Sequence, residues 1–208
     1  MEEYWNKEWS NNKIDEYIKY IRPDFTPRFF EIFSKYNIKN VCDAACGFGT
    51  YSIMLNNRGF EVSGFDIAEN SVNLTKNMLK HFKLPNDDYK TCSITDISFK
   101  DEAFDAVVAH AVIDHLSKKS ACTALNELYR ITKQGGLIYL SFDCLEEDDL
   151  NLAHEILEDG SFLYTDKSRD GLLFNHYTNE DIEKLLLGKQ QIYFNTTKRG
   201  DREVILKK

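Results

Sequence analysis

The sequence predicts an α/β fold with a doubly wound, mostly parallel seven-stranded sheet, helices on both faces and an antiparallel C-terminal hairpin. Three observations predict it. Apolar strand-like runs alternate with helical segments from residue 39 to residue 142, in the order β-α-β-α-β-β-α-β. The connections are short, which favours right-handed crossovers between parallel strands. Two final apolar runs flank a four-residue turn containing Gly200, which is typical of a hairpin.

Composition narrows the class of protein. The chain has 208 residues and a formal net charge of −8, so we expect one domain and no nucleic-acid partner. It has no apolar run of about 18 residues and begins with acidic and aromatic residues, so we expect no membrane partner. Five cysteines are sparse, and Cys42 and Cys46 lack a second pair or a nearby histidine. We therefore expect a cytoplasmic protein without a metal site.

The first 36 residues differ from the rest of the chain. Residues 11–36 have the pattern of two helices, the first capped by Asn12 and ended by Pro23, the second begun by Thr26 and Pro27. Their apolar faces consist of Ile14, Tyr17, Ile18 and Ile21, and of Phe29, Phe30, Phe33 and Tyr36.

The remaining elements follow in order along the chain. Strands are expected at residues 41–45, 60–65, 89–92, 104–109 and 137–142, and helices at 50–58, 69–82 and 120–131, the last ended by Gly135 and Gly136. The connection over residues 143–177 is long enough to be functional or to have structure of its own. Thr178 then caps a helix, and strands at 191–196 and 202–206 complete the sheet.

A ligand site is expected where the first strand ends. Open α/β sheets bind ligands outside the carboxyl ends of their strands, and residues 43–50 lie there. Gly47 and Gly49 carry no Cβ, so a ligand can approach the backbone and the N–H groups of the helix that follows. Asp66 ends the second strand, where one carboxylate can accept hydrogen bonds from both hydroxyls of a ribose. The segment therefore predicts a cofactor that contains a nucleoside.

Asp43 bears on which cofactor this is. Gly47, Gly49 and Ser52 fill the dinucleotide pattern G-x-G-x-x-G with a small third residue. A carboxylate four residues before Gly47 would face a pyrophosphate badly, but it suits a cationic ammonium. Ala44 and Ala45 leave room beside it, so the pattern favours a cofactor that carries an amine.

These residues resemble the class I S-adenosylmethionine-dependent methyltransferases. Residues 41–50 are similar to the family's first motif, an acidic residue followed by G-x-G-x-G, with Ala45 replacing the first glycine. We expect Ala45 to have a negative φ and to change little at the methionine end. Residues 64–67 resemble the ribose-binding strand end. Residues 95–97 resemble the adenine site, in which Asp96 would take the exocyclic amine and Ile67 and Ile97 would flank the ring.

Later segments extend the resemblance. Residues 109–116 resemble the segment that closes around the methionyl part, which makes His110 a neighbour of the cofactor. Residues 135–140 resemble the entry to the fifth strand, and the hairpin agrees with the sixth and seventh strands. The resemblance is close over residues 37–142 and looser beyond.

The resemblance implies a Rossmann-like fold, S-adenosylmethionine as cofactor and methyl transfer by in-line displacement to a small molecule. It implies a helical lid over residues 1–36, a cofactor-binding domain over 37–208 and a substrate-side insertion over 143–177. The implied cofactor residues are Asp43, Ala44, Ala45, Gly47, Gly49, Asp66, Ile67, Asp96, Ile97 and His110. The protein would mainly position the acceptor and exclude water, with a base needed only where the acceptor loses a proton.

No residue stands out in the sequence as the general base. The candidates for catalysis are His110, His115, His176 and Tyr177. The candidates for contact with substrate are Trp5, Trp9, Tyr20, Phe142 and Tyr177, with Tyr4 beside them. Two alternatives stay open, a non-catalytic S-adenosylmethionine-binding protein and an NAD(P)-dependent oxidoreductase. The acceptor atom and the oligomeric state stay open as well.

Overall fold

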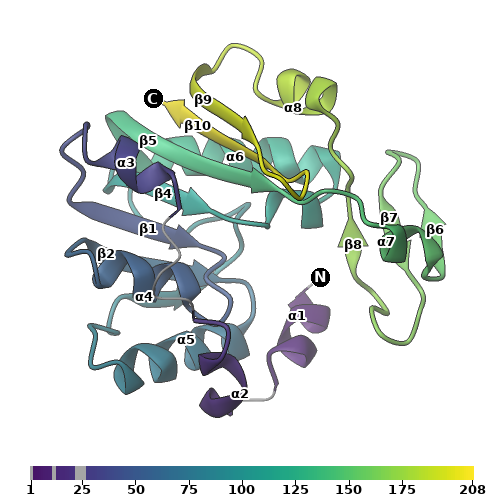
Figure 1. Cartoon of the computed structure of the whole chain (residues 1–208), viewed down its shortest axis with the longest axis horizontal. Coiled ribbons are helices and arrows are strands. Elements are labelled where there is room, and N and C mark those ends of the chain that lie inside the picture. Colours follow the sequence, from purple (N-terminus) through teal and green to yellow (C-terminus); the bar gives the residue numbers. More distant parts are fainter. Residues whose placement is uncertain (1, 11–12, 22–26) are drawn as a thin grey trace.

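The main sheet has the predicted architecture. A computed structural model describes residues 2–10, 13–21 and 27–208. In these residues seven strands form one sheet in the order β3-β2-β1-β4-β5-β10-β9 (Figure 1). Their bounds are β1 Asn40–Ala44, β2 Glu61–Asp66, β3 Tyr89–Thr91, β4 Phe104–Ala109, β5 Thr132–Phe142, β9 Gln190–Thr196 and β10 Arg202–Lys207. β1 to β5 pair in parallel, and β10 runs antiparallel to both β5 and β9. This confirms the predicted fold class.

Helices cover both faces of this sheet. One face carries α3 (Phe29–Phe33), α4 (Thr50–Asn56) and α5 (Glu69–His81), and the other carries α6 (Lys118–Ile131) and α8 (Asn179–Leu185). Successive strand residues face opposite ways, so Val41 packs in the cluster with α3 and α4, whereas Cys42 packs in the cluster with α6 and α8. No helix among the described residues is long and apolar enough to cross a bilayer.

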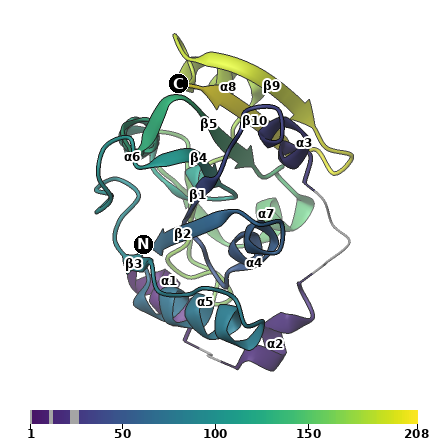
Figure 2. The same cartoon turned by 90° about the vertical axis from the view of Figure 1, so that its left-hand side faces the viewer.

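Two short helices precede α3. α1 (Glu2–Glu8) was not expected, and α2 (Ile14–Ile18) is shorter than expected. The expected boundary residues Asn12, Pro23 and Thr26 lie outside the described residues. α1 is tied to the start of α5, because the backbone N–H and side-chain amide of Asn70 donate to Asn6 at 3.3 and 2.7 Å. Both helices lie beside α5, at the opposite end of the molecule from β9 (Figure 2).

α3 does not lie with α1 and α2 beside α5. Phe29 and Phe33 are almost completely buried and pack on the sheet with Tyr139 of β5. The expectation of a helical lid over residues 1–36 is therefore wrong at its C-terminal end. The aromatic repeat of this helix serves the core of the sheet.

The connection between β5 and α8 has structure of its own. It contains α7 (Glu147–Asn151) and a three-stranded antiparallel sheet of β6 (His154–Ile156), β7 (Phe162–Tyr164) and β8 (Leu173–Phe174). The acidic run begins α7, where Glu146 and Asp149 form a capping box, and Asp149 also pairs with Arg169. Tyr164 and Phe174 pack with Tyr4 and Trp5 of α1. The small sheet and α1 therefore meet beside the carboxyl ends of the parallel strands (Figure 1).

β5 begins earlier than expected. It starts at Thr132 and passes through the glycine pair, which was expected to separate helix from strand. Gly135 has φ 76°, and the pairing of β4 with β5 shifts register between Phe104 and Ala106. A bulge thus carries the chain directly from α6 into the strand.

Candidate cofactor and acceptor site

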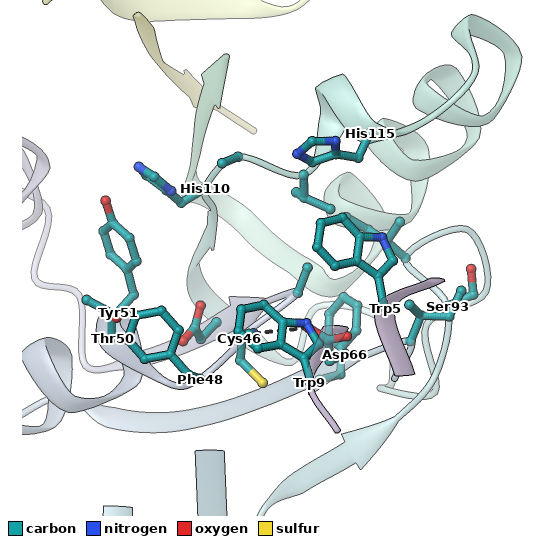
Figure 3. A pocket seen from close by; sticks show the side chains of 18 of the residues that line it. Trp5, Trp9, Cys46, Phe48, Thr50, Tyr51, Asp66, Ser93, His110 and His115 are labelled. Carbon is teal, nitrogen blue, oxygen red and sulfur yellow. Dashed lines mark hydrogen bonds between the residues drawn. The ribbon is translucent and has the colours of Figure 1, made fainter. Parts of the chain in front are cut away.

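A cavity of about 580 Å³ opens at the carboxyl ends of β1, β2 and β4 (Figure 3). This is the place where open α/β sheets bind ligands, and the volume is typical of a small-molecule site. It is lined by Trp5, Trp9, Tyr20, Asp43, Ala45, Cys46, Gly47, Phe48, Thr50, Tyr51, Met54, Phe65, Asp66, Ile67, Ser93, Ile94, His110, Ala111, Val112, His115 and Leu116.

The glycine turn forms the floor of the cavity. Gly47 has φ 55° and lines the cavity, and a Cβ there would lie 3.6 Å from the Trp9 ring. The hydroxyls of Ser71 and Thr75 on α5 both donate to the Gly47 carbonyl, at 2.7 and 2.8 Å. Gly49 has φ 87° but does not line the cavity; a Cβ there would lie 3.0 Å from Thr75 Cγ2. Gly49 therefore permits packing on α5, whereas Gly47 gives the close backbone approach expected of both glycines.

Ala45 corrects one expectation. It lines the cavity as expected, but its φ is 60°, in the left-handed region, where we expected a negative φ. A side chain with a Cβ is strained there. The turn thus keeps the backbone shape that glycine would adopt, because the Cys46 N–H donates to the Phe65 carbonyl at 3.0 Å and fixes the next residue.

Asp43 is a buried carboxylate at the end of β1. It is 3% exposed and accepts a hydrogen bond of 2.5 Å from the Ser52 hydroxyl on α4. Burial raises the pKa of Asp43 to about 6, and the hydrogen bond from Ser52 opposes this rise. Among the residues that the structure describes, no lysine or arginine lines the cavity to neutralise this carboxylate. An ammonium group would provide the missing charge.

Asp66 occupies the equivalent position at the end of β2. It is 6% exposed, and its two oxygens accept hydrogen bonds of 3.0 Å from the backbone N–H groups of Gly47 and Ala68. Burial raises the pKa of Asp66, and these hydrogen bonds oppose the rise. A carboxylate has about four acceptor positions, so two remain for the hydroxyls of a ribose. Ile67 lines the cavity directly beside it.

The predicted adenine residues are not at the cavity. Asp96 is exposed and outside the lining, and Ile97 is buried in the core, where its N–H donates to Glu127 Oε2 at 2.8 Å. Ser93 and Ile94 line the cavity instead. β3 ends at Thr91, so the carboxyl edge of the sheet is reached at these residues and not three residues later. The strand was predicted at residues 89–92, close to its observed bounds, and the adenine role of residues 95–97 was only what the family resemblance implied.

Aromatic side chains from three segments surround the opening. Trp5, Trp9 and Tyr20, the N-terminal residues expected to contact substrate, line the cavity. Trp5 lies on α1, Trp9 directly follows it, and Tyr20 follows α2. The ring centroids of Trp9 and Phe48 are 6.0 Å apart, and Trp5 meets the edge of His115 at 5.2 Å. The N-terminal helices and the glycine turn thus close one side of the cavity together.

Two of the predicted catalytic candidates line the cavity. His115 ends the 3₁₀ helix η1 (Ile113–His115), and its Nδ1 lies 3.1 Å from the Leu173 carbonyl of β8. His110 follows β4, and its ring lies 4.6 Å from the ring of Tyr51. Burial lowers the pKa of His110, although nearby carboxylates oppose this change.

Other predicted residues lie elsewhere. Phe142 is fully buried in the core and packs on Tyr177 at 5.1 Å, so neither side chain lines the cavity. Their expected contact with substrate is wrong because both fill the interface between the sheet and α8. His176 and Tyr4 are half-buried outside the lining, and Ala44 points into the core.

Several lining residues were not identified from the sequence. They are Cys46, Phe48, Thr50, Tyr51, Met54, Phe65, Ser93, Ile94, Ala111, Val112 and Leu116. Three of them lie in or next to the glycine turn, so their place in the sequence could have identified them: Phe48, Thr50 and Tyr51.

The two ends of the cavity differ in character. In Figure 3, Asp66 and Ser93 lie toward one end, and His110 and Tyr51 lie toward the other. The acidic pair and the close approach at Gly47 fit a nucleoside that carries an amino-acid ammonium. S-adenosylmethionine has this chemistry.

Comparison with known proteins supports this interpretation. Residues 41–136 match the methyltransferase domain family. An uncharacterized methyltransferase of Schizosaccharomyces pombe is 33% identical over 159 residues, covering 67% of this chain and 51% of that protein. The chain spans between 45% and 65% of the length of the curated relatives that it matches.

Solved structures share the fold. A Pyrococcus horikoshii protein superposes with a TM-score of 0.75 at 22% identity, covering 95% of this chain and 93% of that chain. A S-adenosylmethionine-dependent methyltransferase of Methanosarcina mazei gives a TM-score of 0.71 at 23% identity, covering 89% and 98%. Residues 41–136 are thus a methyltransferase domain, and the chain shares its fold with S-adenosylmethionine-dependent methyltransferases.

Proposed function

We propose that the protein is an enzyme that binds S-adenosylmethionine in the cavity and transfers its methyl group to a small-molecule acceptor. The observation that carries this proposal is the placement of Asp43 and Asp66 at the ends of two adjacent parallel strands, in one cavity, with Gly47 between them. Asp43 is buried and no described lysine or arginine lines the cavity, so its carboxylate favours a ligand with a positive group. The carboxylate of Asp66 can accept hydrogen bonds from hydroxyls of the ligand.

The cavity supports a small acceptor. It has a volume of about 580 Å³ and is bounded by α1, the residues after α2 and η1, which favours a small molecule as the acceptor. The net charge of −8 argues against a nucleic-acid acceptor. All five cysteines are unpaired, which supports a reducing compartment such as the cytoplasm.

The roles of the protein's own residues follow from their positions. Asp43 and Asp66 bind and orient the cofactor, and Gly47 lets its backbone approach. When bound, the cofactor supplies an activated methyl group. Trp5, Trp9 and Phe48 cover the opening and exclude water, which favours transfer to the acceptor over hydrolysis. Catalysis then rests mainly on orientation.

Two experiments separate this proposal from the alternatives. S-adenosylhomocysteine should raise the melting temperature of the protein, whereas NAD should not; stabilisation by NAD alone would indicate an oxidoreductase. Release of labelled methyl groups from S-adenosylmethionine should then depend on an acceptor in a panel of small hydroxyl, amine, thiol and carboxylate compounds. Binding without turnover on any member would indicate a non-catalytic binding protein.

A further inference from the structure

The wall of the cavity beyond Asp43 holds a histidine in an unusual setting. Val108 of β4 pairs with Tyr139 of β5, and both side chains pack toward α3 and α4. His110 follows two residues after Val108, so it faces the same side. Its ring lies between Tyr51 of α4, at 4.6 Å, and Tyr139, at 6.5 Å with an interplanar angle of 10°. Packing from two elements therefore fixes the orientation of this imidazole.

The backbone is also held in an uncommon conformation at this point. Ala111, directly after His110, has φ 48° and lines the cavity. Its N–H donates to the Ser141 hydroxyl at 2.8 Å. A left-handed alanine persists only where its surroundings fix it, and such residues are concentrated at functional sites. The turn directs the chain away from β4 with His110 at the cavity wall.

No hydrogen bond joins the His110 ring to another described residue, so its nitrogens are not committed within the described part of the chain. His115 differs, because its Nδ1 is engaged by the Leu173 carbonyl. Because a carbonyl oxygen only accepts, Nδ1 of His115 must carry a proton in this hydrogen bond. The contact connects η1 to β8. His110 is thus the cavity histidine whose ring is free to exchange a proton with a bound molecule.

Carboxylates surround His110 on the same side of the sheet. Asp143 follows β5, Glu203 lies on β10 and Asp201 precedes β10, and all three favour the protonated ring. Glu203 is held by the Tyr139 hydroxyl at 3.1 Å. Burial outweighs these charges and lowers the pKa of His110, so the ring is neutral at pH 7.

One cation moderates this acidic group. Arg199 lies 4.0 Å from Asp201 and 2.8 Å from Glu146, and it also interacts electrostatically with Asp143. Asp143 and Glu203 are still the carboxylates that favour an imidazolium most. A base that is neutral at rest and stabilised once protonated is suited to accept a proton during a reaction.

We propose that His110 is the general base that removes the proton from an uncharged aromatic hydroxyl during methyl transfer, an inference that rests on the proposed function. The O–H bond breaks and its proton goes to a ring nitrogen of His110. The released electron pair forms the O–C bond to the methyl carbon, while the S–C pair returns to sulfur as a thioether. The imidazolium then gives its proton to solvent.

The cavity walls indicate this acceptor class. Trp5, Trp9, Phe48 and Tyr51 offer ring surfaces, which suit a flat aromatic molecule. Among the described residues no lysine or arginine reaches the cavity, so an anionic acceptor would find no partner there. A neutral amine needs no base before it attacks, whereas a phenolic hydroxyl, with a pKa of about 10, does.

The test compares His110→Gln with His115→Gln and with the surface control His81→Gln. Binding of S-adenosylhomocysteine is measured first; if the wild type does not bind it, the proposed function itself fails. Methyl transfer is then measured with 4-methylphenol, with the more acidic 4-nitrophenol, and with ethanolamine and acetate as non-aromatic controls. Wild type should methylate the phenols and not the controls.

His110→Gln should bind S-adenosylhomocysteine as the wild type does and lose kcat on 4-methylphenol by roughly 10²–10⁴-fold at pH 7, with little change in KM. The loss should be far smaller on 4-nitrophenol, because a more acidic hydroxyl gives its proton to water more readily and depends less on a base. Equal losses on both phenols, loss of cofactor binding, or full activity of the variant would overturn the proposal. The proposal would also be overturned if the wild type binds S-adenosylhomocysteine but methylates neither phenol.

A second measurement does not depend on turnover. Nuclear magnetic resonance titration of the five histidines should show two resonances with a pKa below the usual 6.5, because burial lowers the pKa of His176 as well as that of His110. One of the two should be absent from His110→Gln. Asp143→Asn should lower the pKa of that resonance further, since a carboxylate that favours the protonated ring is removed. A His110 resonance that titrates at or above its ordinary value contradicts the assignment.

Discussion

The carboxylate of Asp66 accepts a hydrogen bond from the backbone N–H of Gly47 at 3.0 Å. This contact joins the end of β2 to the turn after β1, across 19 residues of sequence. It orders the turn before any ligand arrives, and it orients the carboxylate toward the cavity. Cofactor affinity should therefore depend on Asp66 in two ways, through direct hydrogen bonds and through the shape of the turn.

Asp66→Asn should weaken binding of S-adenosylhomocysteine by roughly 10–100-fold, the usual effect of losing hydrogen bonds to a charged group. Asp96→Asn should leave affinity unchanged, because Asp96 is exposed outside the cavity. Isothermal titration calorimetry of both variants measures this difference. Weak binding by Asp96→Asn would restore the adenine role that the sequence predicted for it.

The free energy of unfolding should depend on pH because the carboxylate of Asp43 is buried. Its folded pKa is raised to about 6 from 3.8, so protonation favours the folded state. The resulting stability is fully present below pH 3.8 and is lost as the pH rises through 6. Asp43→Asn should therefore stabilise the ligand-free protein at pH 7.5 by roughly 1–3 kcal/mol, and Asp87→Asn, an exposed site, should not. Urea denaturation checks both; a destabilised Asp43→Asn contradicts the burial argument.

Cofactor affinity should depend on the same group. Below pH 6 Asp43 is largely protonated and attracts an ammonium less strongly, so S-adenosylhomocysteine should bind about tenfold more weakly per pH unit. Asp43→Asn should bind weakly at all pH values and show a flatter profile. Calorimetry from pH 5 to pH 8 measures the slope. An unchanged slope in the variant would assign the dependence to another group, such as Asp66.

Ala45→Gly should stabilise the protein by about 1 kcal/mol, because glycine removes the strain of a left-handed alanine at φ 60°. Gly49→Ala, the matched opposite change, should destabilise it, since φ is 87° and the new Cβ would lie 3.0 Å from Thr75. Thermal unfolding of the two variants gives the comparison. A lower melting temperature for Ala45→Gly would show that the turn is not strained there.

Fluorescence should report ligand binding, since both tryptophans of the chain, Trp5 and Trp9, line the cavity. Titration with S-adenosylhomocysteine should change the emission of the wild type, with the same Kd as calorimetry. Trp9→Phe should lose most of the signal because Trp9 lies over Gly47. Binding heat without any change in emission would place the ligand away from α1.

Local signals in the sequence predicted three residues that the fold brings to one cavity. Asp43, Gly47 and Asp66 lie at strand ends and in a turn, which apolar runs and glycines mark without knowledge of the fold. Asp96 and Ile97 were predicted from the family resemblance, although the strand before them was predicted at residues 89–92, and Ser93 and Ile94 line the cavity instead. Phe142 was misplaced because a strand exposes alternate residues to different faces, and the sequence does not show which face borders the cavity.

The N-terminal segment shows a second limit. The periodicity of residues 27–36 predicted a helix, and α3 is there, but periodicity cannot distinguish packing on the sheet from packing over the cavity. His110 illustrates the same point, because its ring meets Tyr51, Tyr139 and carboxylates on β10 and next to β5 and β10 only in the folded chain.

Calorimetric titration of the wild type tests the central claim most directly. S-adenosylhomocysteine should bind with one-to-one stoichiometry, NAD should give no heat, and the variant with both Asp43→Asn and Asp66→Asn should not bind while keeping its fold by circular dichroism. Absence of heat with S-adenosylhomocysteine, or unchanged affinity in the double variant, would contradict the account.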